Sequence, residues 1–340
     1  MSPVDPAPAG GSHDLVLSGV GLTKHFAVRG DRFGGHRAVV TAVQDVDLEL
    51  HAGECLALVG ESGCGKSTLA NLLTRLEPLT AGELHVHGQR ETATGRRQLR
   101  EFRRKVQIVL QDPYAALDPR MTVETILAEP LAIHADLMPK ADRSERISQL
   151  LNMVGLDDSY RQRYPHEFSG GQRQRVCIAR ALAVSPSILV CDEPLSALDV
   201  SIQGQILELF AQLREQLNLS YIFISHDLAV VRSIADRVAV MYLGRIVEQG
   251  PTAELYRNPQ HPYTQALLSA APSADPSRRD RADRIRLSGE VPSPLDPPSG
   301  CPFRTRCWRA DDRCAQQLPR LEPQTTPGHL AACWRIGEPD

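Results

Sequence analysis

The glycine-rich segment GESGCGKS at residues 60–67 constrains the fold of this chain more than any other part of the sequence. It follows the apolar run CLALV and precedes the helical pattern TLANLLTRL, so it has the strand and the helix that a phosphate-binding loop requires. Glycines let backbone N–H groups wrap a triphosphate, and a helix N-terminus favours its negative charge. The segment therefore predicts a nucleoside triphosphate site in an α/β domain.

Two side chains of this P-loop have expected roles of their own. Lys66 should reach the β and γ phosphates, and the Ser67 hydroxyl should bind Mg²⁺. A glycine-rich turn without function is the alternative, and the flanking strand and helix disfavour it. The residues predicted to contact the nucleotide are Gly60, Glu61, Ser62, Gly63, Cys64, Gly65, Lys66, Ser67 and Thr68.

Alternating apolar and helical segments surround this loop from about residue 14 to residue 270. Residues 55–59, 106–110, 188–191 and 221–224 are almost wholly apolar, as expected for central parallel strands covered on both faces. Residues 46, 48 and 50 instead alternate with polar residues, which indicates an antiparallel side sheet. Residues 121–163 have helical periodicity, so we expect a helical subdomain at about 113–166.

Charge and hydropathy exclude some classes of function. The formal net charge is −3, with acids and bases interspersed, so no basic face for nucleic acid is expected. No apolar run approaches the roughly 20 residues that span a bilayer. The first 14 residues, MSPVDPAPAGGSHD, lack the features of a secretory signal, so residues 1–13 are expected to be a disordered tail of a cytosolic protein.

Two carboxylates end one of the predicted strands. Asp192 and Glu193 follow the run SILVC, at the strand end where open α/β sheets bind ligands. Asp192 is expected to hold Mg²⁺ through water, and Glu193 to polarise the attacking water. Such a pair alone is more often a strand end that meets solvent. Its position downstream of a P-loop favours the catalytic interpretation.

The segment FSGGQ at residues 168–172 precedes RQRVCIARALA, which has strong helical periodicity. Ser169 is a plausible N-cap of that helix, and the small residues expose backbone N–H groups at its start. Taken alone, SGG indicates only a turn. The ordered set of P-loop, SGGQ and strand-ending Asp-Glu makes a functional interpretation stronger.

This ordered set resembles the ABC transporter ATPases, whose LSGGQ signature the chain matches with Phe168 in place of Leu. The resemblance implies a RecA-like core with an antiparallel β subdomain, a helical subdomain, and ATP and Mg²⁺ as ligands. It also implies head-to-tail dimers, in which the signature of one subunit closes on the ATP of the other. The signature residues are Ser169, Gly170, Gly171 and Gln172.

The other motifs of that family fall at matching positions. Gln111 corresponds to the Q-loop residue that touches Mg²⁺ and the membrane partner, Asp199 to the D-loop, and His226 to the switch histidine. Phe26 occupies the place of the aromatic residue that stacks on adenine, although a core position is an equally simple explanation. A lone histidine after a strand is usually a surface residue, so the assignment of His226 as the switch histidine depends on the presence of the other motifs.

The phrases QDPYAALDPRMTV, YPHEFSGGQRQR and NPQHPYTQALL narrow the resemblance to ATPases of dipeptide and oligopeptide importers, and GQRQR and CPFRTRC resemble their F-type subunit. This implies a second ATPase subunit in a heterodimer or a homodimer, two transmembrane permeases, and indirectly a peptide-binding protein. The chain would lie at the cytoplasmic face of the membrane. Importers of nickel or glutathione, an exporter, and a soluble ABC ATPase are the alternatives.

A Pro-rich, Cys-containing extension is expected at residues 271–340. Cys301, Cys307, Cys314 and Cys333 have five, six and eighteen residues between them, which matches neither zinc pairs nor ferredoxin runs. Because the tail is too polar to predict a core of its own, metal ligation could staple it. Related subunits carry a [4Fe-4S] cluster at similar cysteines, so a cluster, zinc and free thiols all stay open. Cys55, Cys177 and Cys191 lie in apolar segments and are expected in the core.

Overall fold

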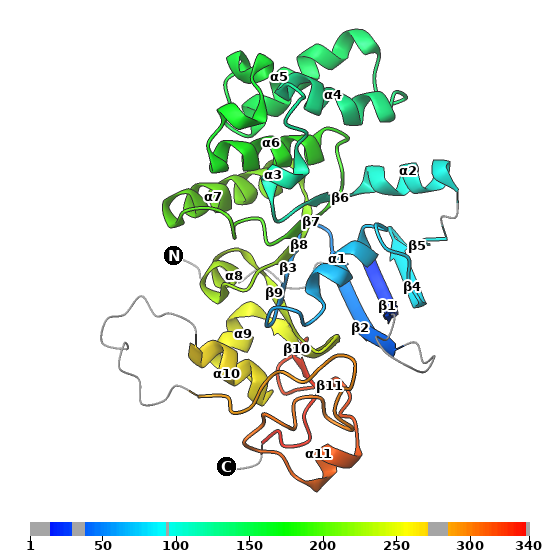
Figure 1. Cartoon of the computed structure of the whole chain (residues 1–340), viewed down its shortest axis with the longest axis vertical. Helices are drawn as coiled ribbons and strands as arrows, with labels where there is room; N and C mark the ends of the chain where they lie inside the picture. Colours follow the sequence, from blue (N-terminus) through cyan, green and yellow to red (C-terminus); the bar gives the residue numbers. More distant parts are fainter. Residues whose placement is uncertain (1–13, 29–37, 93–94, 271–284, 338–340) are drawn as a thin grey trace, which may run out of the picture.

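The computed structural model describes residues 14–28, 38–92, 95–270 and 285–337 (Figure 1). The predicted tail at 1–13 and the part of the Pro-rich segment at 271–284 lie outside these residues. The strands are β1 (Leu15–Val28), β2 (Ala38–His51), β3 (Cys55–Val59), β4 (Ala81–Val86), β5 (Gln89–Arg90), β6 (Val106–Val109), β7 (Ile188–Asp192), β8 (Ser220–Ile224), β9 (Arg237–Tyr242), β10 (Arg245–Pro251), β11 (Glu322–Pro323) and β12 (Leu330–Ala331).

The helices surround two sheets. They are α1 (Lys66–Leu73), α2 (Arg96–Lys105), α3 (Pro113–Ala116), α4 (Val123–Ile133), α5 (Arg143–Met153), α6 (Gly170–Leu182), α7 (Val200–Leu217), α8 (Leu228–Ile234), α9 (Thr252–Arg257), α10 (Pro262–Ala270) and α11 (Asp312–Gln316), with short 3₁₀ turns η1 (Lys140–Asp142), η2 (Asp158–Gln162) and η3 (Pro165–Glu167). In the described part of the chain, no helix has the length and hydropathy needed to span a bilayer.

The larger sheet has the order β11-β12-β10-β9-β3-β8-β7-β6 in the described residues. Strands β9, β3, β8, β7 and β6 are parallel neighbours, and β10 turns back antiparallel to β9. Every residue of β3, β7 and β8 is buried, which explains their continuous apolar sequences. Three of the four strands expected at the centre are therefore confirmed there.

The fourth expected strand, β6, is parallel as predicted but lies at the edge of this sheet. Its two middle residues are only partly buried. Apolar content alone could not distinguish this edge from the centre, because helices α2 and α6 pack against β6.

The second sheet has the order β2-β1-β4-β5, and all of its strand pairs are antiparallel. Val46, Leu48 and Leu50 of β2 are buried while the residues between them are exposed, so the alternation in the sequence is confirmed as a one-sided strand. Figure 1 shows this sheet beside α1, with α3 to α6 at one end of the molecule and the C-terminal extension at the other.

The C-terminal extension has a core, contrary to the expectation of a poorly packed tail. The Phe303 ring is 1% exposed and packs edge-on against Tyr242, with ring centroids 5.3 Å apart, and against Tyr263 at 5.4 Å. Strand β12 pairs with β10, so the extension continues the main sheet. The expectation failed because the partners of Phe303 come from β9 and α10, outside the extension.

A buried contact between a carboxylate and a histidine fixes the same junction. Glu248 of β10 is fully buried, and one of its carboxylate oxygens lies 2.7 Å from Nε2 of His329. The backbone N–H groups of Gln260 and His261 also donate to this carboxylate, at 2.8 and 2.9 Å. A buried charge is tolerated when it is hydrogen-bonded in this way, so the contact with His329 joins the extension to the sheet.

Candidate functional site

The loop between β3 and α1 has a backbone that only glycine can adopt at two positions. Gly60 has φ +153°, and a Cβ there would lie 2.2 Å from the carbonyl oxygen of Met241. Gly65 has φ +110°, and its Cβ would lie 2.3 Å from the carbonyl oxygen of Ala42. These close approaches hold the loop against β9 and β2 and leave its N–H groups at the start of α1.

A pocket of about 250 Å³ opens over this loop. Residues 62–68 line one side of it, and Gln111 and Glu193 line another. Val40, Thr41 and Ala42 of the smaller sheet complete the wall, together with Pro294 from the C-terminal extension. A helix N-terminus, a lysine and backbone N–H groups around a pocket of this size suit a polyphosphate.

Lys66 is buried at the base of the pocket. Its Nζ donates to the carbonyl oxygens of Gly60 at 2.8 Å and Glu61 at 3.0 Å. These two bonds hold the ammonium group inside the curve of the loop. A charge held there is placed to neutralise a phosphate that enters the same curve.

Ser67 and Asp192 meet beside Lys66, although 125 residues separate them in the chain. The Ser67 hydroxyl donates to Oδ1 of Asp192 at 3.2 Å. Burial raises the pKa of Asp192, the neighbouring Glu193 raises it further, and the Ser67 hydrogen bond acts in the opposite direction. A hydroxyl and a carboxylate side by side fit Mg²⁺, which takes oxygen ligands and keeps several waters.

Glu193 follows β7 in a left-handed backbone conformation, with φ +45°. Its Oε2 accepts a hydrogen bond from Nε2 of Gln111 at 3.2 Å and lies 3.2 Å from Nδ1 of His226. Non-glycine residues with positive φ are uncommon and cluster at functional sites. Gln111 and His226, which the sequence predicted separately from the ends of two other strands, thus converge on the Glu193 carboxylate.

The signature residues form a separate surface at the start of α6. Ser169 caps this helix, because its Oγ accepts from the N–H of Gln172 at 3.3 Å while Oε1 of Gln172 accepts from the N–H of Ser169 at 3.0 Å. The predicted N-cap is confirmed. A Cβ on Gly171 would lie 2.5 Å from Cγ2 of Ile202, so glycine allows α6 to approach α7, whose N-cap is Asp199.

Some predicted site residues do not reach the P-loop pocket. Its described lining includes none of Ser169, Gly170, Gly171, Gln172, Asp199, His226, Asp192 or Phe26. Asp192 and His226 are nevertheless joined to lining residues by the contacts above. Phe26 of β1 pairs with Val40, which does line the pocket, and the Nζ of Lys24 lies 4.8 Å from its ring centroid.

Comparison with known proteins agrees with this geometry. A family model described as "ABC transporter" matches residues 43–196, which contain both the P-loop and the signature. The dipeptide transport ATP-binding protein DppF of Haemophilus influenzae is 50% identical over 94% of this chain and 97% of its own length. The chain belongs to the ABC transporter family. It is an ATP hydrolase with the P-loop ABC ATPase fold.

Further relatives of this ABC ATPase cover its C-terminal region as well. A model described as "Oligopeptide/dipeptide transporter, C-terminal region" matches residues 247–314. DppF of Escherichia coli K12 is 49% identical over 95% of both chains. Among solved structures, the ATP-binding cassette MJ0796, bound to ADP and Pi as a dimer, has a TM-score of 0.60 and 28% identity, and covers 69% of this chain and 98% of its own.

The four cysteines of the extension of this ABC ATPase differ in exposure. Cys301 and Cys314 are buried, and Cys307 and Cys333 are partly exposed. Among the described residues, no three or more His, Cys, Asp or Glu side chains are grouped to hold a metal ion. The structure therefore gives no support for a [4Fe-4S] cluster or zinc at these cysteines. Cys55, Cys177 and Cys191 are buried, as expected for core thiols.

Sequence reasoning missed two contributions of the extension to the site of this ABC ATPase. Pro294 lines the pocket, and the Arg306 guanidinium binds the Glu61 carboxylate of the P-loop. Glu61 was expected to contact the nucleotide, yet its side chain pairs with Arg306 and is absent from the described lining. No local sequence pattern predicts a contact between residues that are 245 positions apart in the chain.

Proposed function

We propose that this chain is the ATP-hydrolysing subunit of an importer for dipeptides or oligopeptides. The observation that carries the proposal is an identity of about half over nearly the whole chain with dipeptide transport ATP-binding proteins, together with the matching C-terminal region. ATPases that import nickel or glutathione remain the second candidate for cargo. The chain would act as a peripheral subunit at the cytoplasmic face of the membrane.

The site residues divide the chemistry of ATP hydrolysis among them. Lys66 and the N–H groups of the P-loop would bind the phosphates, and Ser67, Asp192 and Gln111 would hold Mg²⁺ directly or through water. The metal supplies neutralisation of phosphate charge when bound. Glu193 would orient and polarise the attacking water, and His226 would contact the γ-phosphate from the other side of that carboxylate.

A second copy or a related ATPase subunit would complete each site. The P-loop pocket and the capped start of α6 are separate surfaces of one chain, as the described pocket lining shows. Both would contact one ATP only in a head-to-tail dimer, with Ser169 to Gln172 of each subunit on the nucleotide of the other. Whether the pair is a homodimer or a heterodimer depends on the second subunit.

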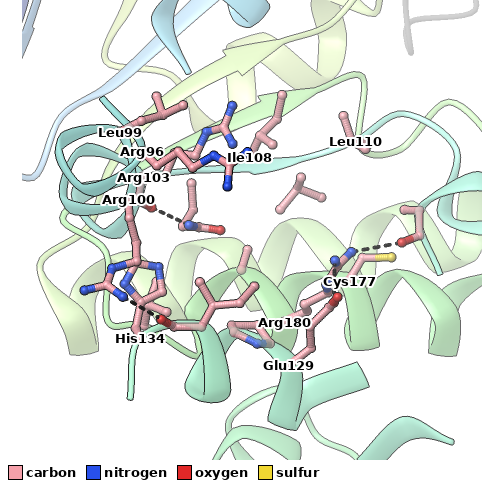
Figure 2. Close-up of a pocket in the computed structure, with 17 residues that line it drawn as sticks. Arg96, Leu99, Arg100, Arg103, Ile108, Leu110, Glu129, His134, Cys177 and Arg180 are labelled. Atoms are coloured by element: carbon pink, nitrogen blue, oxygen red, sulfur yellow. Dashed lines mark hydrogen bonds and ion pairs between the residues drawn. The ribbon is translucent and has the colours of Figure 1, made fainter. Parts of the chain in front are cut away.

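A groove of about 510 Å³ lies between α2 and β6 on one side and α4 and α6 on the other. Figure 2 shows Arg96, Arg100 and Arg103 of α2 facing this groove, with Glu129 and Arg180 across it. Glu129 is bound to Arg180 at 2.9 Å, so the lining has an excess of positive charge. Ile133 is 52% exposed and Leu110 is 40% exposed, which makes the groove partly apolar.

We assign this groove to a cytoplasmic helix of a permease subunit, with apolar side chains toward Ile133 and acidic side chains toward α2. The helical subdomain at about 113–166 would supply one wall. Leu110 of the groove directly precedes Gln111, whose amide binds the Glu193 carboxylate. Movement of the permease could therefore reach the catalytic carboxylate through two consecutive residues.

Charge reversal in the groove should uncouple the subunit from its permeases. In Arg100→Glu, peptide-stimulated ATPase activity of the assembled transporter should fall about tenfold, because the acidic helix is repelled. Arg97→Glu is the matched control, because Arg97 lies on the same helix but outside the groove lining and is 87% exposed. Unchanged stimulated activity in Arg100→Glu, with purified transporter in vesicles, would remove the groove as the docking site.

Growth on peptides tests the cargo. Deleting the gene for this chain in its host should abolish growth on dipeptides or oligopeptides as the sole amino-acid source. The intact chain and Glu215→Gln, which alters an exposed residue of α7, should restore growth, whereas Glu193→Gln should not. Normal growth of the deletion strain on every peptide would reject a peptide cargo and direct the assay to nickel and glutathione.

A further inference from the structure

The C-terminal extension contacts the P-loop through a bidentate ion pair. Nη1 and Nη2 of Arg306 lie 2.7 and 3.0 Å from the two carboxylate oxygens of Glu61. The Arg306 side chain is 8% exposed and that of Glu61 is 28% exposed. Hydrogen bonds to Glu61 raise the pKa of Arg306. A paired guanidinium and carboxylate with two parallel bonds and little solvent is one of the stronger polar contacts in proteins.

The backbone of the extension holds Arg306 in place. The N–H of Arg306 donates to the carbonyl oxygen of Phe303 at 3.0 Å, and Phe303 is packed between Tyr242 and Tyr263. The hydroxyl of Tyr263 in turn accepts from the N–H of Glu61 at 2.8 Å. Residues after position 260 therefore fix both the backbone and the side chain of Glu61.

Glu61 is a sensitive position for a negative charge. Its carbonyl oxygen accepts one of the two hydrogen bonds that orient Lys66, and residues 62–68 line the pocket directly after it. A carboxylate without a partner at this position would repel a bound triphosphate and compete for the Lys66 ammonium. The guanidinium of Arg306 cancels that charge.

We propose that Arg306 is a positioning residue of the ATP site, which neutralises Glu61 and thereby makes ATP affinity depend on the C-terminal extension. The inference rests on the assignment of the P-loop as the ATP site and is independent of the cargo. The proposal predicts that the two replacements affect ATP affinity unequally. Removing Arg306 leaves the negative charge of Glu61 unpaired near the phosphates, whereas removing the Glu61 carboxylate leaves no such charge.

The test uses the purified full-length chain, with the ATP analogue AMP-PNP and Mg²⁺ for binding and with ATP for turnover. Arg306→Gln should weaken AMP-PNP binding and raise KM for ATP about tenfold, within the usual range of coupling between sites. The kcat should stay within about twofold, because the catalytic carboxylate is unaltered. Glu61→Gln should weaken binding less than Arg306→Gln does, because it leaves no unpaired negative charge near the phosphates and its amide oxygen can still accept a bond from Arg306.

The double variant Glu61→Gln/Arg306→Gln distinguishes an effect of the unpaired Glu61 charge from an effect of the lost contact on the structure of the site. It should recover the affinity of Glu61→Gln, because no unpaired carboxylate remains. Arg306→Lys, which keeps the charge but cannot make both parallel bonds, should bind AMP-PNP more tightly than Arg306→Gln does. Arg304→Gln is the matched control, since Arg304 binds Ser299 within the extension and does not touch the P-loop. Thermal unfolding checks that each variant is folded.

Three results would overturn the inference. These are unchanged affinity in Arg306→Gln, a double variant as weak as Arg306→Gln, and losses of affinity that merely follow losses in melting temperature. If Arg306→Gln does not fold, the double variant still decides, because a double variant that binds AMP-PNP more weakly than Glu61→Gln rejects a role for charge. An unaltered affinity in Lys66→Ala would instead reject the ATP site itself.

Discussion

In Glu193→Gln, ATP turnover should fall about 1000-fold, within the range for loss of a general base. The amide has the size of the carboxylate and can still contact Gln111 and His226, so the local geometry survives. It cannot attract a proton from the attacking water, because a neutral amide oxygen is a weak base. Binding should persist, since Lys66 and the Ser67–Asp192 pair are unaltered.

A stable dimer is the second expected property of Glu193→Gln. ATP that binds but is not hydrolysed should hold two subunits together, which light scattering after chromatography in ATP and Mg²⁺ would detect. The control is Glu215→Gln, which removes an exposed carboxylate from α7 and should leave turnover within about twofold. Turnover in Glu193→Gln within tenfold of the unaltered chain would contradict the role of this carboxylate.

The sequence predicted the buried parallel strands well because burial on both faces leaves a continuous apolar run. Strand β3 matches its expected bounds, and β7 and β8 differ from theirs by one residue. The position of β6 at the edge could not be read in this way, because helices α2 and α6 pack against it and allow it to be as apolar as a central strand. The order of strands in a sheet depends on contacts between distant segments, which the sequence of one segment does not show.

The sequence could predict which motifs lie close together only where they follow parallel strands, because the carboxyl ends of parallel strands share one edge of a sheet. Gln111, Glu193 and His226 each follow a different parallel strand, and the structure brings Gln111 and His226 to 3.2 Å from the Glu193 carboxylate. The signature could not be placed in the same way. Ser169 is a local helix cap by sequence and by structure, and nothing local says which nucleotide it faces.

The extension was least predictable because its contacts are long-range. Cysteine spacing and the resemblance of CPFRTRC to F-type subunits predict nothing of the contacts of residues 301–307, where Phe303 is a core residue and Arg306 is the partner of Glu61. Aromatic packing against β9 and a charge pair across 245 residues leave no periodic signal. The polar composition of the segment therefore indicated a weak core, when the apolar partners lay elsewhere in the chain.

Replacement of Lys66 should have the second large effect, which is on nucleotide binding rather than on the hydrolysis step. In Lys66→Ala, the affinity for AMP-PNP with Mg²⁺ should fall about 100-fold, or about 2.7 kcal/mol, because charge-assisted hydrogen bonds to phosphate are lost. The loop itself also loses the two bonds from Nζ to the carbonyl oxygens of Gly60 and Glu61. Titration of the full-length chain measures the loss.

Comparison of nucleotides distinguishes these two causes. If the ammonium acts on the β and γ phosphates, the loss in Lys66→Ala should be greater for AMP-PNP than for ADP. If loosening of the loop dominates, both nucleotides should lose affinity equally, since both depend on the same N–H groups. Lys140→Ala, in the exposed turn η1, controls for the removal of a positive charge elsewhere. A dissociation constant for AMP-PNP within about threefold of the unaltered chain would exclude Lys66 as the phosphate-binding lysine, because a bound triphosphate cannot lose a contacting cation at so little cost.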